Sequence, residues 1–479
     1  MRKYILSSRA AVATPAAEGS TELKPERIQP DNTVFVLLSF EGPDAYSMAG
    51  GLGVRMVNVA RTLSQKGFTT HFFFVGDPNL PGEEVLDEGR LIYHRWCQWI
   101  SQYNPMGVYQ GEEAKLEDFS RSLPPWLIEN VIRPAEETGK LVAVLAEEFH
   151  TADATGRLSE QLRAAKLREN TGIFWNANNT FGFERINWEW LKREVTITAV
   201  SRYMKHIMRE YGVTTMVIPN GIPEDLLRPV NEEAATQVRT VLNGDPLLLK
   251  VARWDPGKAW MQSIEAAALL KSQGRHPVFI ARGGMEGYGK EVLERADWLG
   301  LKVRDVETRD ESVEGRLEAI MAARSADVLN VKFHCQHELL RTLYNACDVV
   351  LANSIHEPFG LVGLEVMASG GVVFTGGTGE DYAQHFFNSI VLDTNDAEEI
   401  ASYLDYLKFH AGVAARLRKA GQVTAHNFTW PFVIDGLIER LESRARVRGA
   451  LARPFEVVVE QTMQRKGEPS PLDAIWLNA

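Results

Sequence analysis

Short apolar segments alternate with helix-length segments along this chain, and this alternation restricts its fold more than any other feature. Residues 34–38 are a run of five apolar residues, which predicts a buried strand. A glycine-containing loop follows, then a helical pattern over 54–66 that Gly67 ends, and then a second, mainly apolar run at 71–75. A strand, a helix and another strand in this order predict two parallel strands joined by a right-handed crossover.

The alternation starts a second time after the turn residues of Ile218-Pro219-Asn220-Gly221-Ile222-Pro223. The sequence therefore predicts an α/β protein with two doubly wound domains, and a ligand site between them at the carboxyl ends of the strands. We expect a loosely held arm at 1–30, a first domain at 31–225, a polar linker at 224–245, a second domain at 246–430, and a last helix (431–447) and tail within 431–479. Further strands are expected at 141–145, 172–175, 197–200 (followed by a helix that Ser201 caps), 217–219, 247–251, 278–281, 349–352 and 372–374.

Composition excludes several classes of protein. The chain has 479 residues, 45% hydrophobic and 24% charged, as expected for a globular protein of more than one domain. Its net charge of −11 argues against nucleic-acid binding. No apolar run is long enough to span a bilayer, and polar residues interrupt any signal-like segment after Met1. Cys97, Cys335 and Cys347 form no disulfide framework, so we expect a cytoplasmic protein.

Two glutamates eight positions apart, Glu357 and Glu365, flank a glycine-containing turn in the second domain. Glu357 follows the predicted strand 349–352, and Glu365 lies about one and a half turns into the next helix. At the start of that helix, backbone N–H groups without intrahelical partners can bind an anion, namely those of Phe359, Gly360, Leu361 and Val362. A nucleotide sugar, with hydroxyls at both ends and phosphates in the middle, fits this arrangement.

The stretch from Leu351 to Gly371 (S-x-x-E-P-F-G-L-x-x-x-E-x-M-A-S-G from Ser354) resembles the E-x7-E motif of retaining glycosyltransferases of family 4, which have the GT-B fold. The resemblance extends over about residues 33–430. It implies two Rossmann-like domains that face each other across a cleft, and a reaction that needs neither metal nor cofactor. It also implies that Glu357 contacts sugar hydroxyls, that Glu365 contacts the ribose, and that the last helix crosses back to the first domain.

Two cations, Arg253 and Lys258, follow the first strand of the second domain and are joined by a Pro-Gly turn. A guanidinium and an ammonium group at this spacing can hold a diphosphate. The block resembles G-R-x-x-x-x-K-G of the family, with Ala252 and Ala259 in place of two glycines. Gly283 and Gly284, which follow the predicted strand 278–281, resemble the short glycine turn that faces the donor in that family.

In the first domain, Gly50 and Gly51 begin the helix after the first strand. Glycines here allow a phosphate or sugar to approach the backbone at the positive end of the helix. The loop resembles the G-G-x-[AG] loop of GT-B enzymes. Glycogen and starch synthases have a lysine where this chain has Met48, which argues against a synthase of that type.

Two polar residues of the first domain resemble groups that face the transferred sugar. His150 follows the strand at 141–145 and resembles the histidine of the H-x-W/H-D loop. Asn178 stands where many relatives have the histidine of T-x-H-N-x-x-x-G. An amide can position a sugar by hydrogen bonding, but it does not carry a proton as imidazole does.

Two other clusters receive no catalytic role. His334-Cys335-Gln336-His337 lacks a further ligand at metal-site spacing, so we assign no metal and favour a loop near the nucleobase or plain surface. A basic cluster near the last helix, made of Arg444, Arg446, Arg448 and Arg453, is expected to be a solvated helix end, with a lipid-surface patch as the alternative.

Taken together, the sequence predicts a retaining, metal-independent hexosyltransferase that uses a nucleotide-diphosphate sugar and requires no cofactor. Its acceptor would be a carbohydrate or lipid-linked molecule, and a homo-oligomer is left open. One alternative is a non-catalytic nucleotide-sugar-binding protein or subunit. Others are a glucan polymerase similar to glycogen or starch synthase, or a related GT-B phosphorylase or epimerase.

Overall fold

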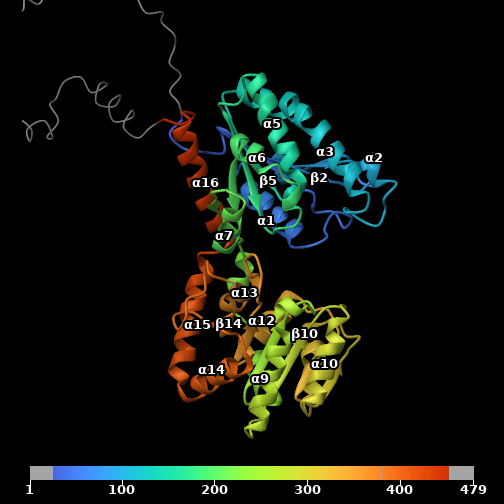
Figure 1. The fold of residues 1–479 in the computed structure, drawn as a ribbon, viewed down its shortest axis with the longest axis vertical. Helices are drawn as coiled ribbons and strands as arrows, with labels where there is room; N and C mark the ends of the chain where they lie inside the picture. Colours follow the sequence, from blue (N-terminus) through green and yellow to red (C-terminus); the bar gives the residue numbers. More distant parts are fainter. Residues whose placement is uncertain (1–24, 378, 453–479) are drawn as a thin grey trace, which may run out of the picture.

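The computed structural model describes residues 25–452 except residue 378, and it contains two parallel sheets, one above the other in Figure 1. The N-terminal sheet has eight strands in the order β3-β4-β2-β1-β5-β6-β7-β8, and only the β3–β4 pair is antiparallel. These strands are β1 (Thr33–Leu38), β2 (Thr69–Val75), β3 (Glu83–Leu86), β4 (Leu91–Trp96), β5 (Leu141–Glu147), β6 (Thr171–Ala177), β7 (Thr196–Ala199) and β8 (Met216–Val217).

The central strands of this sheet form because their side chains are apolar on both faces. Every residue of β1 is buried, and it pairs in parallel with β2 and β5, for example Phe35 with Thr70 and Ala143. Helices cover both faces of such a sheet, which explains the continuous apolar runs in the sequence. They are α1 (Gly51–Gln65), α2 (Gln98–Ser101), α3 (Glu112–Leu127), α4 (Arg133–Glu137), α5 (Ala152–Ala164), α6 (Trp188–Glu194) and α7 (Arg202–Glu210).

The strands predicted in the first domain are present, with bounds that differ by a few residues. The helix after β1 begins at Gly51, before the predicted start at residue 54, because the glycine loop is itself the first turn of α1. Ser201 caps α7 as predicted, since its side chain accepts the N–H of Met204 at 3.0 Å.

The C-terminal sheet has seven parallel strands in the order β11-β12-β10-β9-β13-β14-β15. They are β9 (Leu247–Val251), β10 (Val278–Arg282), β11 (Val303–Val306), β12 (Val328–Val331), β13 (Val349–Ala352), β14 (Val373–Thr375) and β15 (Ile390–Val391). The adjacent strands β9 and β13 end side by side, with Val350 opposite Leu249. The loops after them carry the Arg253–Lys258 block and the Glu357–Glu365 motif.

The segment 224–245 differs from the polar linker that the sequence predicts. It contains helix α8 (Glu232–Leu242), which Asn231 caps and which buries Ala235, Val238 and Leu242. α8 packs against α12 in the second domain. The remaining helices are α9 (Trp260–Ser272), α10 (Tyr288–Trp298), α11 (Val313–Ala322), α12 (His337–Ala346), α13 (Leu361–Ala368), α14 (Ala397–Phe409), α15 (Ala411–His426) and α16 (Trp430–Val447).

Helix α16 leaves the second domain and packs along α1 of the first (Figure 1). Its apolar residues join a core with Phe35 and Phe174, and Trp430 is buried at its start. Residues 25–30, which the sequence predicts as part of a loose arm, lie against this helix. The N–H of Ile28 donates to Glu442 at 3.0 Å, whereas the rest of the predicted arm and of the tail lies outside the described residues.

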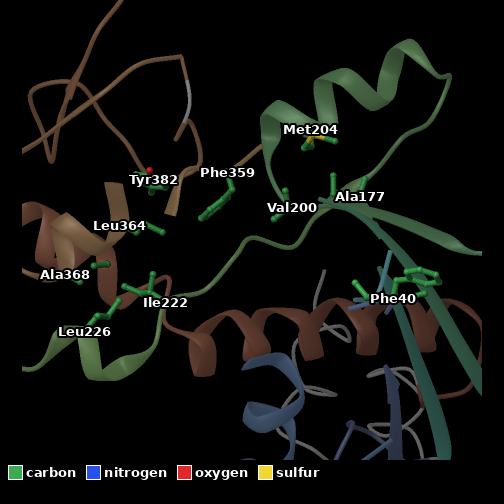
Figure 2. Close-up of a cluster of buried hydrophobic side chains, with 14 of the residues drawn as sticks. Phe40, Ala177, Val200, Met204, Ile222, Leu226, Phe359, Leu364, Ala368 and Tyr382 are labelled. Carbon is green, nitrogen blue, oxygen red and sulfur yellow. The ribbon is translucent and has the colours of Figure 1, made fainter. Parts of the chain in front are cut away.

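The carboxyl ends of the two sheets face each other. Figure 2 shows Ala177 and Val200, at the ends of β6 and β7, on the side of Phe359, and these side chains belong to one buried cluster with Tyr382. Arg202, at the start of α7, donates its backbone N–H to Asp381 at 3.0 Å. The loops after the strands of both sheets therefore border the same space.

The chain passes between the domains twice, and the two passages are bonded to each other. Ile222 donates its N–H to Phe428 O at 2.8 Å, and Trp430 donates its N–H back to Ile222 O at 3.0 Å. Gly221 lies against Trp430, where an added Cβ would come within 2.6 Å of the indole.

Candidate active site

Lys258 and Glu357 form an ion pair across the ends of β9 and β13. Lys258 Nζ lies 3.2 Å from Glu357 Oε1, and both side chains are partly exposed. The two loops are also joined by their backbones, because Ile355 donates its N–H to Gly257 O at 2.8 Å. The Pro-Gly turn is held by Asp255, which accepts the N–H of Gly257 at 2.8 Å. These bonds fix a cation and a carboxylate side by side at the face that looks toward the first domain.

The turn between Glu357 and α13 has the shape that the sequence motif requires. Gly360 is the residue before the helix and has φ +82°, a conformation that glycine adopts without strain. Phe359 is buried against Tyr382, and the hydroxyl of Tyr382 donates to Gly360 O. The start of α13 is thereby fixed, with the backbone N–H groups of Leu361 and Val362 in its first turn.

Glu365 lies one turn further along α13 and is half-buried. The hydroxyl of Tyr344 donates to its Oε2 at 3.3 Å. Burial raises the pKa of Glu365, and the nearby His337 opposes that rise. The carboxyl group therefore retains an oxygen that can accept a hydrogen bond from a ligand hydroxyl at this edge of the sheet.

A buried lysine lies close enough to the ion pair for its charge to interact with both members. Lys250, on β9, is 1% exposed and donates to Leu351 O at 3.2 Å and to Asn353 Oδ1. Its pKa is lowered to about 7, mainly by burial, which the charge of Glu357 opposes and that of Lys258 reinforces. The positive charge of Lys250 thus changes near neutral pH within range of both members of the ion pair.

Arg253, in the loop after β9, and the glycine turn after β10 both lie near Glu286. Arg253 is exposed, and its charge, like that of Arg282, lowers the pKa of Glu286 beyond the larger effect of backbone N–H donors. Gly283 leaves room for the indole of Trp254, and Gly284 for the carboxylate of Glu286. The glycines therefore accommodate side chains of this chain, at the border of a pocket of about 780 Å³.

The glycine loop of the first domain is occupied by a carboxylate. Glu41 Oε2 accepts the N–H of Gly50 at 2.8 Å and that of Gly53 at 2.9 Å. Its Oε1 accepts the hydroxyl of Tyr109 at 2.6 Å. A Cβ added to Gly51 would meet no atom within 4 Å, so close approach to the loop is open at Gly51.

Asn178 is part of a buried polar network. Its side-chain amide donates to Glu147 Oε2, and its backbone N–H donates to Glu148 Oε1 at 2.7 Å. Glu147 also pairs with Arg55 at 3.2 Å and accepts from Asn176 at 2.8 Å. The network holds the Asn178 side chain toward β5, so its hydrogen-bonding groups are engaged by other residues of the chain.

Glu148 has two unusual properties. Its backbone has φ +68° and ψ 166°, a combination that residues other than glycine rarely adopt. It is 3% exposed, and burial, with help from the charge of Glu147, raises the pKa of its carboxyl group to about 8. A pKa of about 8 favours the protonated carboxylic acid at neutral pH, next to the backbone of the sequence-predicted residue Asn178.

His150 is buried and neutral. Its Nε2 lies 2.7 Å from Glu112 Oε1, and its ring stacks on Phe40 at 4.5 Å. Burial, and then the charge of Arg185, lowers its pKa to about 3. Within the described part of the chain, its Nδ1 has no hydrogen-bond partner. His150 lines a groove of about 1050 Å³ between α3, α5 and α6, and the structure gives it no contact with Asn178.

Comparison with known families gives a match for the part of the chain that contains this arrangement. Residues 232–423, which contain the ion pair and the α13 motif, match the model of the family described as "Glycosyl transferases group 1". Over this part, the chain is similar to group 1 glycosyltransferases. Over 416 residues it is 27% identical to the D-inositol 3-phosphate glycosyltransferase of Nocardia farcinica, which covers 82% of this chain and 84% of that protein.

Solved structures confirm the predicted GT-B fold of this chain. The sucrose-phosphate synthase of Thermosynechococcus elongatus aligns with a TM-score of 0.57 at 18% identity, over 86% of this chain and 100% of that chain. HepE of Anabaena in complex with UDP aligns with a TM-score of 0.55 at 16% identity, over 86% and 100% of the two chains. These similarities show the fold and carry no statement about the substrate.

The structure adds candidate site residues that the sequence did not assign. Glu41, Glu147, Glu148 and Lys250 are buried or nearly buried acids and bases at the ends of central strands. Lys250 interrupts an otherwise apolar strand, and Glu147-Glu148 ends another, which are signals that mark them in the sequence. Their partners come from other strands, so their hydrogen bonds are visible only in the folded protein.

Residues 25–377 and 379–452 lack a metal-binding cluster and a membrane-spanning helix. This part of the chain has no group of three or more His, Cys, Asp or Glu residues that could hold a metal ion. Among its helices, none has the length and apolar composition needed to cross a membrane.

Proposed function

We propose that this transferase moves a sugar from a nucleoside diphosphate sugar to a hydroxyl group of its acceptor with retention of the anomeric configuration. The observation that carries the proposal is the Lys258–Glu357 pair beside the start of α13. Lys258 and the backbone N–H groups at the start of α13 would bind the diphosphate, and Glu357 would accept from sugar hydroxyls. These groups lie within one short stretch of surface, as a nucleotide sugar requires.

In the proposed reaction, the acceptor oxygen attacks the anomeric carbon on the side of the leaving diphosphate. The bond from the anomeric carbon to the phosphate oxygen breaks as the new glycosidic bond forms, and the acceptor proton moves to that phosphate oxygen. Lys258, Arg253 and the N–H groups at the start of α13 would stabilise the growing negative charge. Because these groups are cations and dipoles of the protein, we propose that turnover needs no divalent metal.

The donor would extend from this point toward α12. Glu365, with Tyr344 as its donor, is placed to accept hydrogen bonds from the ribose diol. Glu357 would accept from the transferred sugar. Asn178 and His150 belong to the opposite domain, and we propose that they shape the side of the site that the sugar and the acceptor occupy.

We propose that the acceptor is a small phosphorylated polyol or sugar. Support comes from the name of the similar protein of Nocardia farcinica described above, D-inositol 3-phosphate glycosyltransferase. The groove beside His150 has about 1050 Å³ and is lined by Arg121, Arg157 and Arg185. The three free, buried cysteines agree with the proposed cytoplasmic location.

A set of donors and acceptors tests this proposal. Uridine, adenosine and guanosine diphosphate sugars are incubated with inositol phosphate, fructose 6-phosphate and their unphosphorylated counterparts, with and without EDTA. The expected result is nucleotide release that depends on one phosphorylated acceptor and is insensitive to EDTA. The glycosidic linkage of the product should have the same anomeric orientation, axial or equatorial, as the donor. Inverted product stereochemistry would overturn the retaining assignment.

A binding protein without transfer activity is the second candidate, and one observation favours it. Glu41 occupies the N–H groups of Gly50 and Gly53, and Asn178 is bonded to Glu147, so two predicted sugar contacts are engaged within the chain. In that case the same assay would show saturable nucleotide-sugar binding without nucleotide release.

A further inference from the structure

Four arginines converge on one pocket at the edge of the first domain that lies opposite the proposed active site. Arg163 is in the last turn of α5, Arg168 in the loop before β6, Arg193 in α6, and Arg448 directly after α16. Together they line a pocket of about 640 Å³. Figure 1 shows the ends of α5 and α16 at the same extremity of the molecule.

The pocket is separated from the proposed active site by the length of a strand. Arg168 precedes the amino end of β6, whereas Asn178 follows its carboxyl end. β6 has seven residues, so at about 3.3 Å per residue the two points are about 23 Å apart. The arginines therefore have no direct contact with a donor at the Lys258–Glu357 pair.

Like charges in this pocket repel one another. The pKa of Arg168 is lowered to about 10, mainly by burial and then by the charges of Arg448 and Arg163. The pKa of Arg448 is also lowered, by burial and then by Arg444. Bringing several guanidinium groups together costs free energy that an anion among them would recover.

The acidic residues of the pocket balance only part of this charge. Four guanidinium groups face two carboxylates, those of Glu169 and Glu194. Glu194 is buried and pairs with Arg163, while Arg168 donates to Ser159 Oγ at 3.0 Å and to Glu194 O at 3.0 Å. Cations also suit helix C-termini, which accounts for Arg163, Arg193 and Arg448 one at a time. It does not account for Arg168, which precedes β6, or for the convergence of all four.

The whole chain has a net charge of −11, so a positive pocket is an exception on its surface. Arginine binds phosphate oxygens with paired N–H donors, and the pocket has room for more than a single ion. We propose that these four arginines form a binding site for a phosphate group, carried either by a small phosphate ester or by a lipid headgroup. A phosphate bound there joins α16 to α5 and α6, so it stabilises the attachment of the crossing helix.

Binding is measured in a background that lacks the proposed diphosphate contacts, Arg253→Ala with Lys258→Ala. The probes are inorganic phosphate and pyrophosphate, titrated by calorimetry at constant ionic strength with chloride as the reference anion. In the same background, Arg193→Gln with Arg448→Gln removes two exposed guanidinium groups. The charge-matched control is Arg416→Gln with Lys419→Gln, two exposed cations of α15.

The expected result is saturable binding that weakens by about tenfold or more in the Arg193/Arg448 variant and is unchanged in the control. Co-sedimentation with phosphatidylcholine vesicles, with and without phosphatidylglycerol, identifies the source. Binding of free phosphates alone indicates an ester, and binding of anionic vesicles through the same arginines indicates a headgroup. No binding of either kind, or equal binding by the Arg193/Arg448 variant, overturns the proposal. Neither outcome depends on transferase activity.

Discussion

Lys258 and Glu357 lie 3.2 Å apart although they follow different strands of the C-terminal sheet. They meet because β9 and β13 are neighbours and parallel, so that both loops emerge at the same edge. Each side chain holds the other in place before any ligand binds. In the proposed reaction, the cation would turn to the phosphate and the carboxylate to the sugar, with little loss of side-chain freedom.

Lys258→Ala and Arg253→Ala are each expected to lower kcat/KM by the equivalent of about 2–5 kcal/mol, because each removes a charge that stabilises the leaving diphosphate. Steady-state kinetics with the productive donor check this, and circular dichroism checks the fold. Lys419→Ala, at an exposed position of α15, is the control. Activity within a few-fold of wild type in both variants would remove these residues from the diphosphate site.

The two glutamates of the motif are expected to respond differently. Glu365→Gln keeps the shape of the side chain but removes a charged acceptor, so affinity for the free nucleotide should fall by about 1.5–3 kcal/mol. Glu357→Gln should lower turnover more than nucleotide affinity, because its proposed partner is the sugar. Calorimetry with the nucleoside diphosphate separates the two, and unchanged binding by Glu365→Gln would rule out the ribose contact.

Asn178→Ala is expected to lower turnover and leave the binding of free nucleotide unchanged, since the nucleotide occupies the other domain. The lost hydrogen bond to Glu147 should also cost about 1 kcal/mol of stability. Asn178→His tests whether imidazole, the usual residue of the resembled family, restores turnover. A lower melting temperature with normal turnover would show that Asn178 only supports the fold.

Glu148→Gln is expected to flatten the dependence of stability on pH. The pKa of Glu148 rises from 4.5 to about 8 on folding, so between these pH values the folded state binds more protons than the unfolded state. Wild-type stability contributed by this group therefore falls as pH rises from about 4.5 to about 8 and is level above that range. Melting temperatures measured across the window should fall less in the variant. Parallel curves would mean that Glu148 is ionised in the folded protein.

Ala259→Gly is expected to keep or raise stability. Ala259 has φ +54°, where L-residues other than glycine are strained by about 1–2 kcal/mol, and a glycine here relieves that strain. Ala267→Gly, inside helix α9, is the control and should lower stability by about 1 kcal/mol. Chemical denaturation compares the two, and an equal loss in both variants would contradict the strain.

The central strands and the α13 motif are predictable because their signals are local. Residues 247–251 and 349–352 are apolar runs between turn residues, and they are the observed strands β9 and β13. No strand is predicted at β3, β4, β11, β12 or β15. The signal of β3, for example, is weak because this strand is short and at the sheet edge, with charged residues and alternating exposure. Helix α8 did have a signal, the cap Asn231 followed by Ala235, Val238 and Leu242 at helical spacing.

Hydrogen bonds between segments that are distant in the chain could not be predicted from the sequence. Glu41 looks like any loop carboxylate, and only the folded loop shows that it takes up two N–H groups of the glycine turn. From the sequence, Gly283 is expected to leave space for a ligand, whereas in the structure the indole of Trp254 occupies that space. In both cases the residue type indicates close approach, and the tertiary structure decides what approaches.

The two chain segments that connect the domains are hydrogen-bonded to each other and therefore resist twisting as one unit. A single connecting segment lets two bodies swivel about any free backbone bond. Here Ile222 is hydrogen-bonded to both Phe428 and Trp430 of the second segment. Twisting one segment would therefore strain the hydrogen bonds that join it to the other. The domains can therefore move toward or away from each other more easily than they can rotate about the long axis of the two connecting segments. Strand ends that face each other across the gap thus keep their angular alignment while the gap widens or narrows.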